Sequence, residues 1–328
     1  MTALYGPDDL LHEAGPQHDW QESVVLIFHD AASGLAGFLR AGTEPNQKLS
    51  QPYVSFVSRD GLRYRHHPFD TPMQPGDRTA EGFASGPVTW RIPRGEYVHV
   101  TATTPDVRAD LRLYDWFPSQ PWQMFGPGGL SQLAPGHLES SGRVEGVVEI
   151  GGRRFEIRDG LGHRDHSWGT RDVRVMRNFR WVAGTCGSQL SFSGICVHMA
   201  NGMFMRGGWI HQGGVVRKIS SFDVVAQINV DGVSTRGGYA EWGLADGGAV
   251  RVDAEVIDGI VTSYRSDHGG PGSHVGVEGM AVARSGGLAG FCDFNVSNNL
   301  CGGEQVAPSV CEEWATFRNG LSQRPPRP

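Results

Sequence analysis

The segment GLGHRDHSWGTRD, residues 160–172, places two histidines, two aspartates and two arginines beside one tryptophan. Carboxyl and imidazole groups exchange protons near neutral pH, so this segment is a candidate acid–base site. Burial in an apolar cavity disfavours the charged form of a carboxyl group and so keeps it protonated. We therefore predict that Asp165 donates a proton, and that His163 or His166 orients it or takes a proton back.

The same segment has a simple two-sided pattern if it is extended, because side chains alternate along a strand. His163, Asp165, Ser167 and Arg171 then share one face. The opposite face carries Arg164, His166, Trp168 and Thr170. Only one set lines a cavity unless the chain bulges, and glycines 160, 162 and 169 could permit a bulge.

Two other interpretations of this segment stay open. Arg164, Asp165, His166 and Arg171 could form an ion-paired latch that joins two domains, which is a structural role. Alternatively, His163, Asp165 and His166 resemble fragments of a metal site, although the third and fourth ligands that such a site needs are not evident nearby. We predict no metal and no organic cofactor.

Aromatic residues gather around this segment and in a proline-rich passage before it. Most fill cores, but some could form the wall of an apolar pocket and stabilise a passing cation. Aromatic rings together with one proton donor suit carbocation chemistry on an alkene or a tertiary alcohol. A second carboxylate could come from Glu241, Glu278 or Asp293, which lie in apolar strand contexts. The residues that we predict to bind substrate are Trp168, Trp181, Trp209, Tyr114, Trp116, Trp122 and Phe179.

The rest of the chain reads as short strands between glycine-rich turns. Two successive sets of roughly eight strands suit two closed β-barrels, each with room for one small ligand. Residues 117–136 could hold a short helix or a loop over a site, and one helix is expected around residues 309–319. The expected strands are 23–30, 35–42, 52–58, 62–69, 88–93, 97–104, 109–117, 146–158, 178–186, 189–199, 203–214, 216–225, 235–247, 249–258, 274–286 and 288–297.

Composition restricts the partners and the compartment. The 47 glycines among 328 residues favour turns, and the net charge of −6 gives no field for nucleic acid. The N-terminus lacks the apolar core of a secretory signal, no stretch is apolar enough to cross a bilayer, and the five cysteines form no CxxC. We therefore expect a cytoplasmic monomer or homodimer without a stable membrane anchor. Nucleotide and hydrolase motifs such as GxGxxG, GxxxxGK[ST], HExxH and GxSxG are also missing.

The residues GHRDHSWG (162–169), followed by an RD pair and a strand bearing a tryptophan, resemble the AttH-like and carotenoid 1,2-hydratase (hydroxyneurosporene synthase) group. Its members are double-lipocalin proteins with a comparable G-x-x-D-H-x-W-G segment between two barrels. The N-terminal DDLLHEAGPQHDWQESVVLIFHD and FLRAGTEPNQ are similar to the opening of such proteins. Members add or remove water at isoprenoid double bonds, relatives cyclise, and no organic cofactor is needed.

That resemblance makes Asp165 the proton donor, with His166 beside it and Trp168 as an aromatic neighbour. Hydratases of carotenoids face membranes and long polyenes, whereas this chain shows no amphipathic anchor, so a smaller terpenoid fits better. The expected fold is all-β, with two consecutive lipocalin-like (calycin-like) antiparallel barrels and short helices. The barrels span residues 1–158 and 178–328, and 159–177 form an inter-barrel segment.

The combined prediction is a cofactor-independent hydratase or dehydratase, or a related isomerase or cyclase, that acts on a small isoprenoid alkene or tertiary alcohol. One alternative is a non-catalytic protein that binds a small apolar ligand. The other is a metal-dependent hydrolase.

Overall fold

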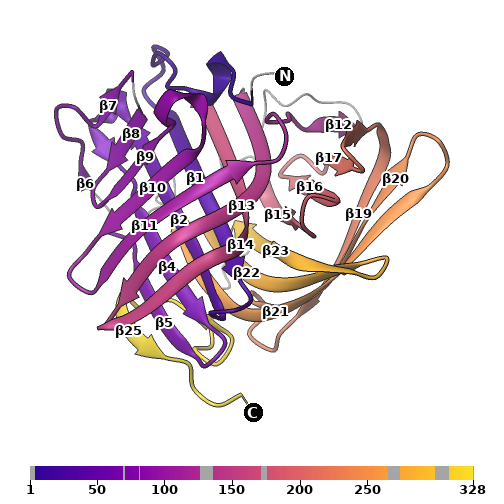
Figure 1. Cartoon of the computed structure of the whole chain (residues 1–328). Helices are drawn as coiled ribbons and strands as arrows, with labels where there is room; N and C mark the ends of the chain where they lie inside the picture. The colour runs from indigo at the N-terminus through magenta and orange to yellow at the C-terminus, as the bar shows by residue number, and fades with distance from the viewer. Residues whose placement is uncertain are drawn as a thin grey trace. The chain divides into compact units, whose positions relative to one another are not determined.

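The computed structural model describes residues 4–68, 71–80, 82–125, 136–170, 176–264, 274–299 and 310–327. These residues form two compact units, each built on one antiparallel sheet (Figure 1). The first unit comprises Met1–Pro121, Leu133–Arg171 and Asn319–Gln323. The second comprises Trp122–Gln132, Asp172–Arg318 and Arg324–Pro328. The all-β prediction is confirmed.

The first sheet curls until β8 and β9 lie against β2, and its interior holds a core of aliphatic and aromatic side chains. It follows the order β25-β5-β4-β2-β1-β14-β13-β11-β10-β9-β8-β7, with β3 and β6 at its side. Its strands are β1 (Trp20–Asp30), β2 (Leu35–Glu44), β3 (Leu49–Ser50), β4 (Tyr53–Ser58), β5 (Leu62–His66), β6 (Thr71–Pro72), β7 (Arg78–Thr79), β8 (Gly82–Ser85), β9 (Val88–Arg91), β10 (Val98–Thr103), β11 (Val107–Asp115), β13 (Gly136–Ile150), β14 (Arg153–Thr170) and β25 (Gly320–Gln323).

The second sheet also curls, so that β19 comes against β16 and β17 around a separate apolar core. Its order is β12-β17-β16-β15-β23-β22-β21-β20-β19, with β18 beside β17 and β24 beside β21. Its strands are β12 (Gln123–Phe125), β15 (Met176–Thr185), β16 (Leu190–Met199), β17 (Phe204–Gln212), β18 (Val215–Arg217), β19 (Ile219–Ile228), β20 (Thr235–Leu244), β21 (Ala249–Tyr264), β22 (His274–Ser285), β23 (Leu288–Asn299) and β24 (Ala315–Thr316). Two curled antiparallel sheets in one chain match a double lipocalin-like fold.

Helical structure in the described residues is limited to three 3-10 turns, η1 (Pro7–Asp9), η2 (Pro45–Gln47) and η3 (Pro93–Gly95). The helix expected around 309–319 is wrong for its described part, since a turn and β24 occupy residues 312–316. Ala315 is fully buried and β24 pairs with β21, so strand pairing decides the conformation there. No described helix has the length and apolar character that crossing a membrane requires.

Residues 146–158 form a hairpin and not the single strand that their alternation suggested. Ile150 pairs with Arg153 across Gly151 and Gly152, whose φ angles are 56° and 83°. A two-residue turn of this kind needs left-handed backbone at both positions, which glycine adopts without strain. The hairpin joins β13 to β14, and these two long strands carry the polar residues described below.

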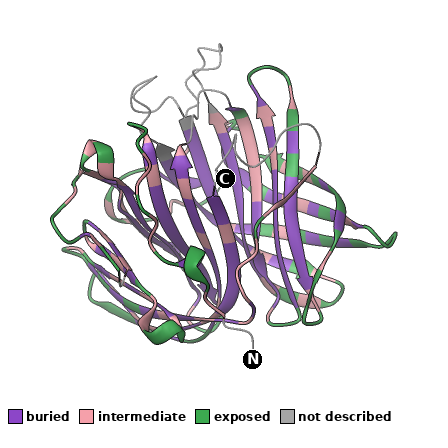
Figure 2. Cartoon of the chain, turned by 90° about the horizontal axis from the view of Figure 1, so that it is seen from above, coloured by how far each residue is buried: buried purple, intermediate pink, exposed green. Residues whose placement is uncertain are grey.

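The division of the chain also differs from the predicted boundaries. Residues 159–170 are the last two thirds of β14 in the first unit, and the predicted linker residues 171–175 lie outside the described residues. The passage 117–136 contains β12, which pairs with β17, while residues 126–135 are not described. Buried residues run along both sheets, and exposed residues concentrate in the turns (Figure 2).

Candidate functional site

Strand β14 presents the predicted polar residues on two opposite faces. Its pairing with β1 runs without interruption from Leu161 to Thr170, so no bulge turns the strand there. His166 and Arg164 lie opposite Val24 and Leu26, which belong to the apolar core. The core therefore defines an inner face with Arg164, His166 and Trp168, and an outer face with His163, Asp165 and Ser167.

Asp165 on the outer face ends a row of titratable side chains from β13 and β14. The Asp165 Oδ2 atom lies 3.2 Å from Nδ1 of His137, and the Nε2 atom of His137 lies 3.1 Å from Oε1 of Glu139. His163 follows, with Nε2 3.9 Å from Glu139 and Nδ1 3.0 Å from the Ser141 hydroxyl. The structure thus places His163, and not His166, on the face of Asp165.

This outer row is buried except at one end. The side chains of Glu139 and His163 have no exposed surface and that of His137 has 2%, whereas Asp165 keeps 13%. Burial raises the pKa of Glu139, but the charges and hydrogen bonds of His137 and His163 outweigh it and hold that pKa well below its usual range. Glu139 is therefore an ionised anchor, and Asp165 is the member that another molecule can reach.

The sequence did not reveal His137 and Glu139 as partners of Asp165. They lie 28 and 26 residues before it, at the edge of a passage that was expected to be a loop or a helix. Their register, Glu139 with Asp165 and Ser141 with His163, brings them onto one face. The signal that was present is the alternation His137, Glu139, Ser141, in which every second residue is polar.

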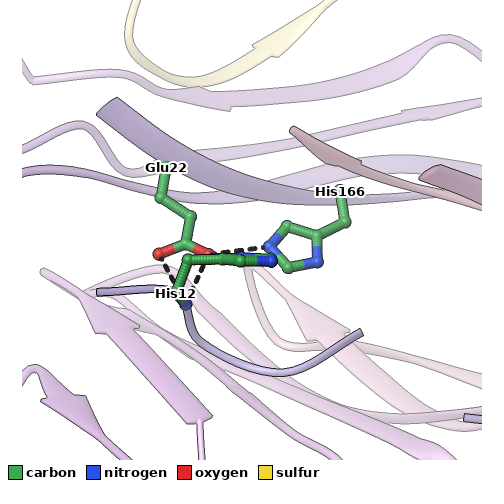
Figure 3. A group of neighbouring side chains, drawn as sticks. All are labelled: His12, Glu22 and His166. Carbon is green, nitrogen blue, oxygen red and sulfur yellow. Dashed lines mark hydrogen bonds and ion pairs between the residues drawn. The ribbon is translucent and has the colours of Figure 1, made fainter. Parts of the chain in front are cut away.

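On the inner face, His166 joins a cluster around Glu22 (Figure 3). The Glu22 Oε1 atom lies 3.0 Å from Nε2 of His166 and 2.7 Å from Nδ1 of His12, and Oε2 accepts from Arg78 at 2.8 Å. Burial raises the pKa of Glu22, yet these partners lower it to about 2. Trp168 stacks on His12 with ring centroids 3.7 Å apart. The cluster fastens the N-terminal segment to the sheet.

Arg164 makes a second ion-paired group on the same inner face. Its guanidinium donates to Asp9 at 2.7 Å and to Asp115 at 2.8 Å, and all three side chains are buried. Burial, only partly offset by Arg164, raises the pKa of Asp115 to about 6. These pairs lie within the first unit, whereas the latch that the sequence suggested for Arg164 joined two domains. Arg171 lies outside the described residues.

Two of these groups have donor sets that could hold a metal ion. They are His12–Glu22–His166 and His137–Glu139–Asp165, and in each the ligand atoms lie within 4.8 Å of one another. In the first set, Glu22 already accepts from two histidines and Arg78, so an ion would have to displace strong hydrogen bonds. In the second set, each ring nitrogen of His137 faces a different carboxyl group, at 3.1 Å for Glu139 and 3.2 Å for Asp165.

The predicted aromatic wall is divided among several places. Trp122 and Trp181 both donate from Nε1 to the Ser193 hydroxyl, at 3.1 and 3.2 Å, on the second sheet. Trp209 and Phe179 share that face, but Trp168 belongs to the His12 cluster of the first unit. Tyr114 lies on the first sheet, where its hydroxyl donates to the partly exposed Glu145 and its ring lies beside Arg143.

Trp116 is half-buried at the end of β11, and its backbone N–H donates to Ser141. Among the other predicted groups, Glu241 is exposed, while Glu278 and Asp293 are buried. The four described cysteines are free thiols, and Cys301 lies outside the described residues.

A surface hollow of about 710 Å³ lies beside the N-terminal turn of the first unit. Tyr5, Pro7, Leu10, Ile92 and Pro93 are among its lining residues. No residue of the outer row or of the Glu22 cluster lines this hollow, so it is not a cavity of the acid–base groups.

The fold and the buried polar rows define an all-β protein with two curled antiparallel sheets and titratable groups on its central strands. The chain belongs to the family described as "Domain of unknown function (DUF7064)", whose model matches residues 7–300. No curated protein matches the chain.

Several solved structures share the fold at low identity. CghA in complex with Sch210972 is 10% identical, with a TM-score of 0.60 over 90% of this chain and 94% of that one. A protein assigned as AttH from Nitrosomonas europaea is 13% identical, with a TM-score of 0.61 over 90% and 97%. Kievitone hydratase from Nectria haematococca is 11% identical, with a TM-score of 0.55 over 91% and 93%. These likenesses support the AttH-like architecture, and no carotenoid hydratase is among these three.

Proposed function

We propose that this chain is a cofactor-independent enzyme that adds water to, removes water from, or rearranges a small isoprenoid alkene or tertiary alcohol by proton transfer at Asp165. The observation that carries the proposal is the row Glu139–His137–Asp165, in which a buried carboxylate and an imidazole stand behind a partly exposed carboxyl group. The likeness to a protein named kievitone hydratase supports the reaction class by analogy of fold.

The proposed chemistry uses the row as a proton relay. In dehydration, Asp165 gives its proton to the substrate hydroxyl, the C–O bond breaks, and water leaves. The Asp165 carboxylate then takes a proton from the adjacent carbon, whose C–H electrons form the alkene. Hydration is the reverse sequence. His137 and Glu139 orient Asp165, and His137 can exchange a proton with it, which differs from the expectation that apolar surroundings alone keep Asp165 protonated.

Asp165→Asn tests this assignment, because the amide keeps the shape of the side chain and cannot transfer the proton. We expect conversion of terpene alcohols to fall by about 10²–10⁴-fold, which is the usual contribution of a general acid. The matched control is Asp110→Asn, because Asp110 is an exposed carboxylate on β11. This variant should convert terpene alcohols at the wild-type rate. Wild-type turnover by Asp165→Asn would defeat the assignment.

The binding-protein alternative gives the opposite pattern. Under that alternative, Asp165→Asn lowers the melting temperature and no product forms with either protein. Under the enzyme proposal, the melting temperature changes little and product is lost only with the mutation.

The metal-dependent hydrolase is the second alternative, and the three ligand atoms of His137, Glu139 and Asp165 are the observation in its favour. It predicts stoichiometric metal in the purified protein and inhibition by a chelator. The proton-relay proposal predicts turnover that a chelator does not change.

A further inference from the structure

The surface hollow of the first unit is a cavity that the proposed function does not use. Its volume of about 710 Å³ lies within the usual range for sites that hold a small molecule. Two segments form its walls, the N-terminal turn around η1 and the turn η3 that follows β9. All of its described lining residues belong to the first unit, so the hollow is a feature of that unit alone.

Most of the lining is apolar. Tyr5 and Ile92 pack against the core of the first sheet, and Pro7, Leu10 and Pro93 extend this apolar surface outward. Leu10 keeps 43% of its surface exposed to solvent. A ligand with a hydrocarbon part would therefore remove apolar surface from water when it enters the hollow.

Buried contacts hold the N-terminal wall in place. Asp9 of η1 accepts hydrogen bonds from the Arg164 guanidinium and from the backbone N–H of Gly6, both at 2.7 Å. The Cζ atom of Arg164 also lies over the ring of Tyr5, 5.4 Å from its centroid. The wall is therefore formed in advance, and a ligand does not have to order it.

Two arginines give the hollow a positive charge. Arg91 at the end of β9 and Arg94 in η3 both line it, and both are exposed. Within the described ranges, neither guanidinium makes a hydrogen bond or an ion pair. Asp8 and Glu96 are exposed and are not among the described lining residues. Two guanidinium groups at an apolar hollow thus have their donors available for an anion.

The backbone of Arg94 is unusual for its residue type. Its φ and ψ angles are 54° and 14°, in the left-handed region that side chains other than glycine rarely adopt. Glycine would take this conformation without strain, so arginine here lowers the stability of the turn. Backbone outliers of this kind cluster at ligand-binding sites, and this one supports a binding role for the Arg94 side chain.

We propose that this hollow binds a small amphipathic anion, in which a carboxylate or phosphate group ends an apolar chain. Arg91 and Arg94 donate charge-assisted hydrogen bonds to the anionic group, and the chain lies against Leu10 and Ile92. The site is separate from Asp165 and needs no reaction there, so the two proposals fail independently.

Four probes separate the contributions of charge and chain. Octanoate and octyl phosphate carry both, octanol carries the chain alone, and acetate carries the charge alone. Ligand-observed NMR titrations of the wild-type protein measure the dissociation constants. At least one of the two amphipathic anions should bind about tenfold more tightly than octanol, the value of roughly one charge-assisted hydrogen bond, and the tighter anion identifies the head group. Acetate should show no saturable binding, and added salt should weaken the anions only.

Arg94→Gly separates binding from stability, because it removes the guanidinium and relieves the left-handed backbone. It should weaken the anions about tenfold, leave octanol unchanged, and keep or raise the melting temperature. The matched control is Lys48→Gly, since Lys48 is the other described residue that is not glycine and has a positive φ, 57°. Lys48 is exposed and is not among the lining residues, so this variant should bind all four probes as the wild-type protein does.

Leu10→Gln tests the apolar wall and should weaken octanol and the amphipathic anions alike. Arg91→Gln repeats the test of charge if Arg94→Gly does not fold. Equal affinity of the wild-type protein for octanol and both anions overturns the proposal. Wild-type affinity for the anions in the arginine variants, or an equal loss in Lys48→Gly, overturns it as well.

Discussion

The two sheets bury polar side chains in different ways. On the inner face of the first sheet, Arg164 matches Asp9 and Asp115, and Glu22 meets Arg78 and two histidines. On the second sheet, Asp293 is equally buried, but no described basic side chain pairs with it. A buried charge that has a partner stays ionised, whereas a buried carboxyl group without a basic partner keeps its proton.

The largest expected effect breaks the matched side of this comparison. Arg164→Met should lower the free energy of unfolding by about 3–5 kcal/mol, because Asp9 and Asp115 would stay buried without a counter-charge. Urea unfolding measures the loss. Arg154→Met, an exposed pair with Glu149, is the control and should change stability by less than about 1 kcal/mol. Equal losses in the two variants would show that the buried pairs add nothing.

A pH effect of intermediate size should come from the Glu22 cluster. Burial lowers the pKa of His166 despite its bond to Glu22, so below about pH 6.5 the unfolded chain takes up a proton that the folded chain does not, and stability falls. The pKa of Glu22 is lowered to about 2, so its contribution is lost as the pH falls from about 4.5 toward 2.

Thermal unfolding between pH 7 and pH 3 measures both losses of stability. In His166→Gln the decline between pH 7 and pH 5 should flatten, while the exposed His18→Gln should retain it. A His166→Gln curve parallel to the wild-type curve would contradict the role given to the Glu22 cluster.

The smallest expected effect concerns Tyr114, whose side chain contacts Glu145 and Arg143 on the first sheet. Tyr114→Phe removes one hydrogen bond to the partly exposed Glu145. The free energy of unfolding should change by no more than about 0.5 kcal/mol, and turnover should be unchanged. A large loss of turnover would return Tyr114 to the substrate site.

Local patterns predicted much of this architecture. Alternation along residues 162–170 correctly separated Asp165 from His166 in direction. Apolar strand contexts pointed to Glu241, Glu278 and Asp293 as candidates for a buried carboxyl group, and of these Glu278 and Asp293 are buried while Glu241 is exposed. What local patterns could not predict is register. Whether His137 meets Asp165 depends on how two strands joined by the Gly151–Gly152 turn align.

Other differences between the sequence-based expectations and the structure share that cause. The helix expected around 309–319 gives way to a strand that pairs with β21. The single aromatic wall is divided because Trp168 faces the core of the first sheet, where His12 stacks on it. In each case, contacts between residues far apart in sequence override the local preference.

Solvent deuterium offers the most direct test of proton transfer by Asp165. Terpene alkenes and alcohols would be incubated with the protein in D₂O, and the deuterium bound to carbon in the product would be counted by mass spectrometry. The account predicts one deuterium at the protonated carbon of a hydrated alkene with the wild-type protein and none with Asp165→Asn. Equal labelling by both proteins, or an unlabelled alcohol formed from an alkene by the wild-type protein, would contradict it.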